Sequence, residues 1–193
     1  MADFPQNFRS RYRGDQKTEL INGNAVSMPS PCIRHHDVVS NIHSMFSWYL
    51  KDKKSFKIFR DSVDVHLTRN NIFVPDFILV TDKNIIKDKG VYGAPDLVVE
   101  VLANSTAKND RLQKKYAYQE GGVKEYWLVD ILNKSVEVYW LTDGVLILRD
   151  FYAIPPTYDL EDMDEEEKLR VVYKFKTTFF DDLTIDIREI FEE

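Results

Sequence analysis

The segment that most constrains the fold is residues 95–130, PDLVVEVLANSTAKNDRLQKKYAYQEGGVKEYWLVD, which predicts a strand, a helix and a second strand in succession. Both strand sequences are almost continuously apolar and rich in β-branched side chains, as is typical of strands covered on both faces. Ser105 and Thr106 offer hydroxyl groups for a helix N-cap, and Gly121 and Gly122 favour the end of the helix. The chain therefore requires a mixed β-sheet flanked by helices, which is an α/β or α+β class.

The remaining segments extend this unit to a single domain over residues 1–193. The pair Asn22-Gly23 favours the tight turn of an N-terminal β-hairpin, and apolar spacing predicts a helix over residues 34–51. Other strands are expected over residues 56–67 (with a bend at 60–62), 71–80, 94–103, 124–131, 135–142, 145–154 and 169–176, with a terminal helix over 186–193. The acidic run at residues 159–167 is expected to be a solvated loop.

Charge and composition restrict the partners. A net charge of -6, from 32 acidic and 26 basic side chains, argues against a protein that grips nucleic acid over its whole surface, so such contact must be local. The chain has no apolar run of about 18 residues and no apolar stretch at its start, so we expect a cytoplasmic protein without a membrane segment. A single cysteine, Cys32, allows neither an internal disulfide nor a thiolate metal cluster.

Two acidic side chains in the apolar strand of residues 95–102 need partners. Asp96 and Glu100 lie on the same face, but four residues of strand separate them by about 13 Å, too far to share one cation. If VPDFILV and PDLVVEVL pair as antiparallel neighbours, Asp76 lies near Glu100. The same register places Asp96 near Val80, at the other end of the ladder. Asp76 and Glu100 are therefore expected to converge.

Carboxylates that face each other require a compensating charge, such as a divalent cation, a shared proton or a lysine. Lys114 is one helical turn from both Asp110 and Tyr118, so its amine could approach the sheet edge. Two carboxylates, a carbonyl such as that of Val101, water and a lysine would form a Mg²⁺ site suited to phosphodiester hydrolysis. The alternative is a buried ion-pair network that only fixes the strand register.

These motifs resemble the Uma-two (Uma2) family, whose members are predicted to have the restriction-endonuclease-like fold of the PD-(D/E)XK superfamily. The resemblance covers most of the chain: PDLVVEVL, the spacing of Asp110, Lys114 and Tyr118, GGVKEYWLVD, SVEVYWL, ELING, PCIRH, DVHL, Pro75-Asp76 and LTIDIREIF. It implies that Asp76 and Glu100 hold the metal. The superfamily lysine two residues after the Glu is Leu102 here, and the resemblance implies that Lys114 replaces it from the helix. Smaller departures are ANST and Lys124, which remove no proposed ligand.

The resemblance also implies that Glu19 and His35 line the same cleft. Glu19 is either a third acid of the site or a solvated residue of an edge strand. His35 either contacts phosphate or is a capping or surface residue. Asp96 either takes part in catalysis or binds backbone amides at the turn after Pro95.

Two further groups have both a functional and a structural interpretation. Basic residues of the predicted helix either contact a DNA backbone or keep the helix soluble: Lys108, Arg111 and Lys115. Aromatic residues of two strands stack on bases, pack in the core or form the seam of a homodimer: Tyr126, Trp127, Tyr139 and Trp140.

The sequence thus predicts an endonuclease that uses Mg²⁺ or Mn²⁺ to hydrolyse DNA. Asp76 and Glu100 would bind the metal and activate water, Lys114 would stabilise a reacting oxygen, and Asp96 and Glu19 are further catalytic candidates. The competing hypothesis is a non-catalytic module of the same fold that binds nucleic acid or protein. The net negative charge and the absence of the strand lysine favour this alternative.

Overall fold

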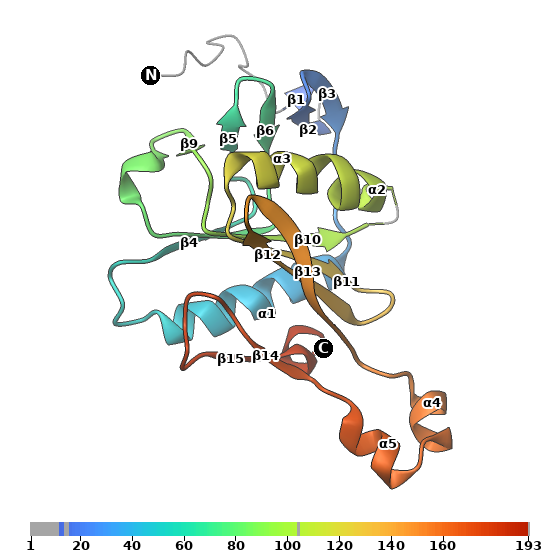
Figure 1. Ribbon diagram of the computed structural model, residues 1–193. Coiled ribbons are helices and arrows are strands. Elements are labelled where there is room, and N and C mark those ends of the chain that lie inside the picture. The colour runs from blue at the N-terminus through green and yellow to red at the C-terminus, as the bar shows by residue number, and fades with distance from the viewer. Residues whose placement is uncertain (1–11, 14–15, 104, 193) are drawn as a thin grey trace.

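A mixed sheet with the strand order β13-β12-β11-β10-β7-β4 forms the centre of the computed structural model, which describes residues 12–13, 16–103 and 105–192 (Figure 1). Its strands are β4 (Lys57–Arg60), β7 (Phe77–Val80), β10 (Leu97–Leu102), β11 (Glu125–Asp130), β12 (Ser135–Thr142) and β13 (Val145–Ala153). Strands β10 and β11 are parallel, and the other neighbours in this sheet are antiparallel. The parallel pair follows from the helical crossover between β10 and β11, which confirms the prediction for residues 95–130.

The crossover is helical but not uniformly α-helical. It consists of α2 (Ala107–Asn109), the π-helix η2 (Asp110–Lys114) and α3 (Lys115–Gly121), and Gly122 ends it with φ 87°. Thr106 is at the N-cap, but its hydroxyl donates to the carbonyl of Ala103 at 3.4 Å, so the expected side-chain cap is not formed. Short π-helical turns are frequent at functional sites because they redirect side chains. Here the π-helix contains both Asp110 and Lys114, and both are buried.

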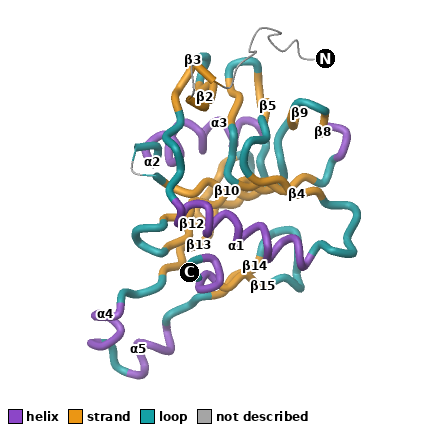
Figure 2. Tube along the Cα trace, turned by 180° about the vertical axis from the view of Figure 1, so that it is seen from behind, coloured by secondary structure: helices purple, strands orange, loops and turns teal. Residues whose placement is uncertain are grey.

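The central sheet is covered on both faces, which explains its continuous apolar strands. Leu97 and Val99 of β10 pack on one face with α1 (Ile33–Tyr49) and α6 (Ile187–Ile190). Val98 packs on the other face with Tyr118 of α3 and with the second sheet. Figures 1 and 2 show α1 and the C-terminal elements on one side, and α3 with the small strands on the other.

The second sheet has the order β1-β2-β6-β5-β9-β8, with β3 also paired to β2. Its strands are β1 (Tyr12–Arg13), β2 (Gln16–Ile21), β3 (Asn24–Ser27), β5 (Val65–Thr68), β6 (Asn71–Phe73), β8 (Ile86–Lys87) and β9 (Gly90–Tyr92), and the 3₁₀ turn η1 (Lys83–Ile85) precedes β8. Asn22 and Gly23 join β2 to β3 with φ of 50° and 82°. The predicted N-terminal hairpin is confirmed.

Two predicted strands are each divided between the sheets. The predicted bend at residues 60–62 separates β4 from β5, because Asp61 and Ser62 have φ of 44° and 60°. The expected single strand over residues 71–80 is wrong, since it breaks around Pro75 into β6 and β7. Proline has no N–H to donate to a ladder, so it favours such an interruption.

The C-terminal predictions need correction. The acidic run at residues 159–167 is solvated, as expected, but most of it is helical. It ends α4 (Thr157–Asp162) and begins α5 (Glu165–Arg170), which extend away from the body of the molecule (Figure 1). Asp164 and Glu167 form a capping box that stabilises the start of α5. The strand expected over residues 169–176 is limited to β14 (Lys174–Lys176), which pairs with β15 (Thr184–Asp186). Within the described ranges, no helix is long and apolar enough to span a bilayer.

The packing of α1 on the central sheet yields a prediction. Phe46 is fully buried, with its ring centroid 5.0 Å from that of Phe77 and 6.0 Å from that of Trp127. We expect Phe46→Ala to lower the free energy of unfolding by about 3–5 kcal/mol in urea denaturation, because it leaves a cavity. The matched control Trp48→Ala, at a position of the same helix that is 83% exposed, should change it by less than about 0.5 kcal/mol. Similar losses for both variants would contradict this account of the core.

Candidate active site

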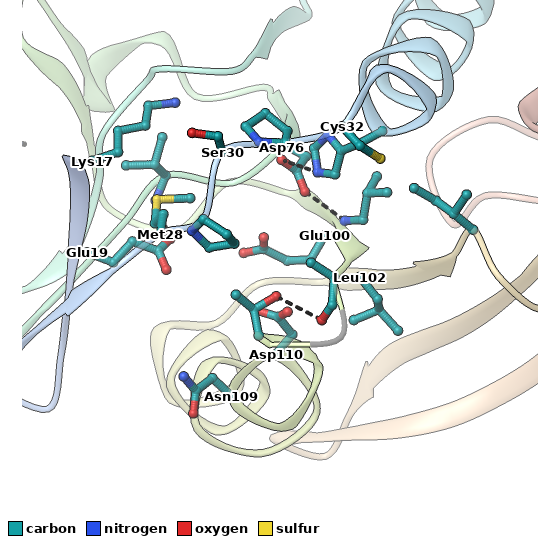
Figure 3. Close-up of a pocket in the computed structure, with 18 of the residues that line it drawn as sticks. Lys17, Glu19, Met28, Ser30, Cys32, Asp76, Glu100, Leu102, Asn109 and Asp110 are labelled. Atoms are coloured by element: carbon teal, nitrogen blue, oxygen red, sulfur yellow. Dashed lines mark hydrogen bonds and ion pairs between the residues drawn. The ribbon is translucent and has the colours of Figure 1, made fainter. Parts of the chain in front are cut away.

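The ladder between β7 and β10 brings Asp76 and Glu100 together. Leu97, Val98 and Val99 pair with Leu79, Ile78 and Phe77, respectively, and the same register places Asp76 opposite Glu100. The backbone N–H of Val101 donates to Oδ2 of Asp76 at 2.7 Å, which orients this carboxylate. Figure 3 shows the side chains of Asp76 and Glu100 in the same pocket. The predicted convergence is confirmed.

These carboxylates lie in a cleft of about 330 Å³ between the two sheets and the crossover helix. One wall is the segment between β3 and α1, which includes Met28 and Ser30 (Figure 3). Asp110 and Asn109 of the crossover face it, and Glu19 of β2 and Lys17 line the end near the hairpin. The cleft is therefore built from elements that are far apart in the sequence.

Lys114 is the buried cation of the cleft, with 3% of its surface exposed. Its Nζ lies 2.9 Å from Oε2 of Glu19, 3.0 Å from Oε1 of Glu100 and 3.3 Å from Oδ1 of Asp110. Burial alone would lower the pKa of Lys114, but the charges of the three carboxylates raise it well above its ordinary value. The side chain is therefore an ammonium ion. Its predicted approach to Glu100 is confirmed, but its other two partners are Glu19 and Asp110 rather than Asp76.

Glu100 is held by two donors on one oxygen. Its Oε1 accepts from the Tyr118 hydroxyl at 2.6 Å and from Lys114 at 3.0 Å. Burial raises the pKa of Glu100 well above its ordinary value; Lys114 lowers it, and Asp110, Glu19 and Asp76 raise it further. Three buried carboxylates thus share one ammonium, and burial disfavours the charged form of Glu100.

Glu19 belongs to the same cluster and is not a solvated edge residue. It is buried, and its Oε1 accepts from the backbone N–H of Val74 at 2.8 Å. Burial raises the pKa of Glu19, although Lys114 and the Val74 N–H act in the opposite direction. Glu19 therefore ties the hairpin to Lys114.

His35 lies inside the cleft, at the first turn of α1. Its Nε2 is 3.2 Å from Oδ1 of Asp76. Burial alone would lower the pKa of His35, but its hydrogen bond to Asp76 and the charges of Asp76 and Asp61 raise it above its ordinary value. His35 thus positions Asp76, which is a different contact from the phosphate proposed for it in the sequence analysis.

Asp96 is placed elsewhere. It is not among the side chains that line the cleft, and it accepts hydrogen bonds from the backbone N–H and the hydroxyl of Thr81, both at 2.7 Å, and from Lys124 at 2.6 Å. Burial alone would raise the pKa of Asp96, but these bonds hold it below its ordinary value. The geometry supports a turn-stabilising role for Asp96, and Lys124, a departure from the family pattern, is its ion-pair partner.

The three crossover residues proposed to contact DNA do not line the cleft either. Arg111 donates to Oε1 of Glu137 at 2.8 and 3.1 Å, and Nζ of Lys115 lies 4.4 Å from the ring centroid of Tyr139. Lys108 is exposed. Among the described residues that line the cleft, the basic side chains are Lys17, Arg34, His35 and Lys114.

The aromatic strand residues are part of the core. Tyr126 and Trp127 are fully buried, and Tyr139 is buried against Tyr126. Trp140 is half-buried beneath the guanidinium of Arg149, 5.0 Å from its ring centroid. Base stacking and a dimer seam formed by Tyr126 and Trp127 are therefore wrong as hypotheses, because the central sheet buries both rings.

Sequence analysis missed three contributions to the site. Asp110 and Tyr118 were visible only through their helical spacing from Lys114, and the contact of Tyr118 with Glu100 was not foreseen. The sequence of the segment around Met28 contains no signal of a functional site apart from its prolines. The position of this segment along the cleft depends on how β3 leads into α1.

The donors of the cleft fit a hard divalent cation in their chemistry. Within the described part of the chain, no group of three or more His, Cys, Asp or Glu side chains has the arrangement of a metal site. Mg²⁺, however, is commonly held by one or two carboxylates together with water. Asp76 and Glu100 are two such carboxylates, and both line the cleft. They are the side chains that would hold it.

The central mixed sheet, the flanking helices and the acids on neighbouring strands define a restriction-endonuclease-like fold. A crystal structure described as "a putative nuclease belonging to DUF820 from Anabaena variabilis ATCC 29413" is similar, with a TM-score of 0.63, 16% identity, and coverage of 92% of this chain and 90% of that chain. The type IIG restriction endonuclease BpuSI is 12% identical over 70% of this chain and 15% of that chain; its TM-score of 0.38 is too low to establish a shared fold.

The family model Uma2, described as "Putative restriction endonuclease", matches residues 5–167. The chain therefore belongs to the Uma2 family, as its motifs indicated. No curated protein matches it in sequence.

The buried cluster predicts a pH-dependent loss of stability when Lys114 is replaced. We expect Lys114→Met to lower the free energy of unfolding by about 3–5 kcal/mol at about pH 7, because Glu19, Glu100 and Asp110 lose their cation. The folded-state pKa values of Glu100 and Glu19 lie above their ordinary 4.5, so the folded protein binds more protons than the unfolded chain above that pH. The free energy of unfolding therefore falls as pH rises through these raised pKa values. The loss of stability caused by Lys114→Met should accordingly become smaller towards about pH 5.

Urea denaturation at both pH values measures this effect. The double variant Glu100→Gln/Lys114→Met, which removes one of the uncompensated charges, should recover part of the loss near neutrality. A deficit that does not depend on pH, or a double variant no more stable than Lys114→Met, would show that the carboxylates are not its cause.

Proposed function

We propose that the chain is an endonuclease that hydrolyses DNA phosphodiester bonds with Mg²⁺ or Mn²⁺ bound in the cleft. The observation that carries this proposal is the convergence of Asp76 and Glu100, from adjacent antiparallel strands, beside the buried ammonium of Lys114. Isolated carboxylates are costly to bury, and their concentration in a cleft is typical of sites with a chemical task. Membership of a family described as "Putative restriction endonuclease" supports the same activity.

Each side chain has a defined task in this proposal. A divalent cation, when bound, lowers the pKa of a water molecule and offsets charge on the phosphate. Asp76 and Glu100 hold the cation, while His35 and the Val101 N–H orient Asp76. Tyr118 and Lys114 both donate to Oε1 of Glu100 and thereby orient this carboxylate, which would hold the cation together with Asp76.

Lys114 acts as a fixed positive charge. It is held by Glu19 and Asp110, whose positions on β2 and on the π-helix keep its amine against Glu100. An ammonium placed there offsets the negative charge that develops on phosphate oxygens during hydrolysis. Glu19 and Asp110 are positioning residues, and Asp96 has no part in this scheme.

A second candidate function is a non-catalytic module that binds nucleic acid or protein. Two observations favour it: Leu102 occupies the strand position of the superfamily lysine, and Lys114 already contacts three carboxylates. In such a module the cluster would act only in joining β2, β10 and the crossover helix.

Thermal unfolding with added Mn²⁺ tests the metal site. At about 100 times its Kd, a cation that binds only the folded state adds about 2.7 kcal/mol, which raises the Tm by about 5–10 °C for a chain of this size. We expect this shift for the wild type and for the control Asp96→Asn. Asp76→Asn and Glu100→Gln should lose most of it. Equal shifts in all four proteins would exclude Asp76 and Glu100 as the metal ligands.

Incubation with supercoiled plasmid and Mn²⁺ tests the reaction. We expect nicked and linear products from the wild type and a rate at least about 100-fold lower for Asp76→Asn, because loss of one essential electrostatic interaction commonly costs that much. Asp96→Asn should retain the wild-type rate. A wild type that binds Mn²⁺ but leaves the plasmid intact would favour the non-catalytic module.

A further inference from the structure

We infer that the cleft receives an unpaired nucleotide, so that the substrate is single-stranded or locally unpaired DNA. The inference rests on the proposed function, and it assigns the substrate class of the same cleft. It is drawn from the depth of the acids, the chemistry of the walls and the distribution of basic side chains.

The carboxylates of the cleft are buried. Glu100 is only 3% exposed, and it lines the cleft together with Met28 and Asp110. Duplex DNA is a stiff rod with a persistence length of about 50 nm, so it does not readily bend a phosphate towards a buried carboxylate. A single strand rotates freely about its backbone and can insert one nucleotide.

The chemistry of the cleft walls suits an unpaired base. Apolar side chains line much of the cleft above the acids: Val26, Met28, Pro29, Pro31, Leu102 and Leu132. Enzymes that act on extruded nucleotides hold the flat face of the base between apolar or aromatic side chains. A volume of about 330 Å³ is at the small end of the range for small-molecule pockets, about 300–1,000 Å³, and suits one nucleotide rather than a duplex.

The placement of the basic side chains also suits a single strand. Affinity for a duplex depends largely on lysines and arginines that neutralise rows of phosphates. On the crossover helix, Arg111 is bound to Glu137 and Lys115 to the ring of Tyr139. Lys17 lines the cleft itself, where it is placed to contact a phosphate that flanks an inserted nucleotide.

Fluorescence anisotropy tests the inference with one labelled sequence in three forms: single-stranded, annealed to a blunt duplex, and annealed to a strand that leaves a central unpaired bubble. Ca²⁺ replaces Mn²⁺ during binding to prevent cleavage. We expect the single strand and the bubble to bind at least about tenfold more tightly than the blunt duplex. Equal or tighter binding of the blunt duplex would overturn the inference.

A pair of leucine variants locates the binding. Leu132 on the cleft wall is 72% exposed, and Leu169 on α5, outside the cleft, is 85% exposed, so neither substitution should disturb the core. Leu132→Asn should weaken single-strand binding at least about fivefold, in proportion to the loss of contact with a base, and leave duplex binding unchanged. Leu169→Asn should match the wild type. Equal effects of both substitutions on single-strand binding would also overturn the inference.

Cleavage of the same three forms with Mn²⁺ separates this inference from the proposed function. Faster cleavage of the single strand, with cuts in the bubble confined to its unpaired part, supports both. Equal cleavage of all forms supports the nuclease function and overturns the inference. Preferential binding of the single strand without cleavage supports the inference and contradicts the hydrolytic function, whereas neither binding nor cleavage contradicts both.

Discussion

The register between β7 and β10 is the constraint on which the rest of the cleft depends. Side chains alternate along a strand, so a slip of one residue would turn Asp76 or Glu100 to the opposite face. Apolar packing prevents such a slip, because Val98 and Ile78 pack in one core while Val99 and Phe77 pack in the other. The burial energy that forms the sheet therefore also holds the two carboxylates together.

The cluster around Lys114 adds a buried amine to the carboxylates that this register brings together. Acids from β2, β10 and the π-helix surround one amine, and burial keeps the pKa of Glu100 well above its ordinary value. Buried ion pairs seldom add net stability, since the desolvation of the charges offsets their attraction. A buried cluster of three acids around one amine is thus better explained by a chemical role than by stability. The π-helical turn contributes by directing both Asp110 and Lys114 inward.

The relocated lysine also explains the character of the cleft. Because the amine reaches Glu100 from the helix, the strand position two residues after Glu100 is free to be apolar, and Leu102 lines the wall there. A cleft with carboxylates at its inner end and apolar side chains on its walls is a different environment from an open groove lined by basic side chains. These apolar walls are one basis of the substrate class that we propose for the cleft.

The sequence by itself determined the sheet and helix class and the hairpin at Asn22-Gly23, because strand alternation and turn preference are local properties. It placed Asp76 near Glu100 only on the assumption that their strands pair, and the tertiary structure supplied that pairing. The sequence left Asp96 and Glu19 ambiguous, since both are acids in strand-like segments. Only the tertiary structure decided between them, by placing Glu19 on Lys114 and Asp96 on Thr81 and Lys124. Tertiary packing likewise divided the segment around Pro75 between two sheets and buried Trp127, because sheet partners distant in sequence leave no local signal.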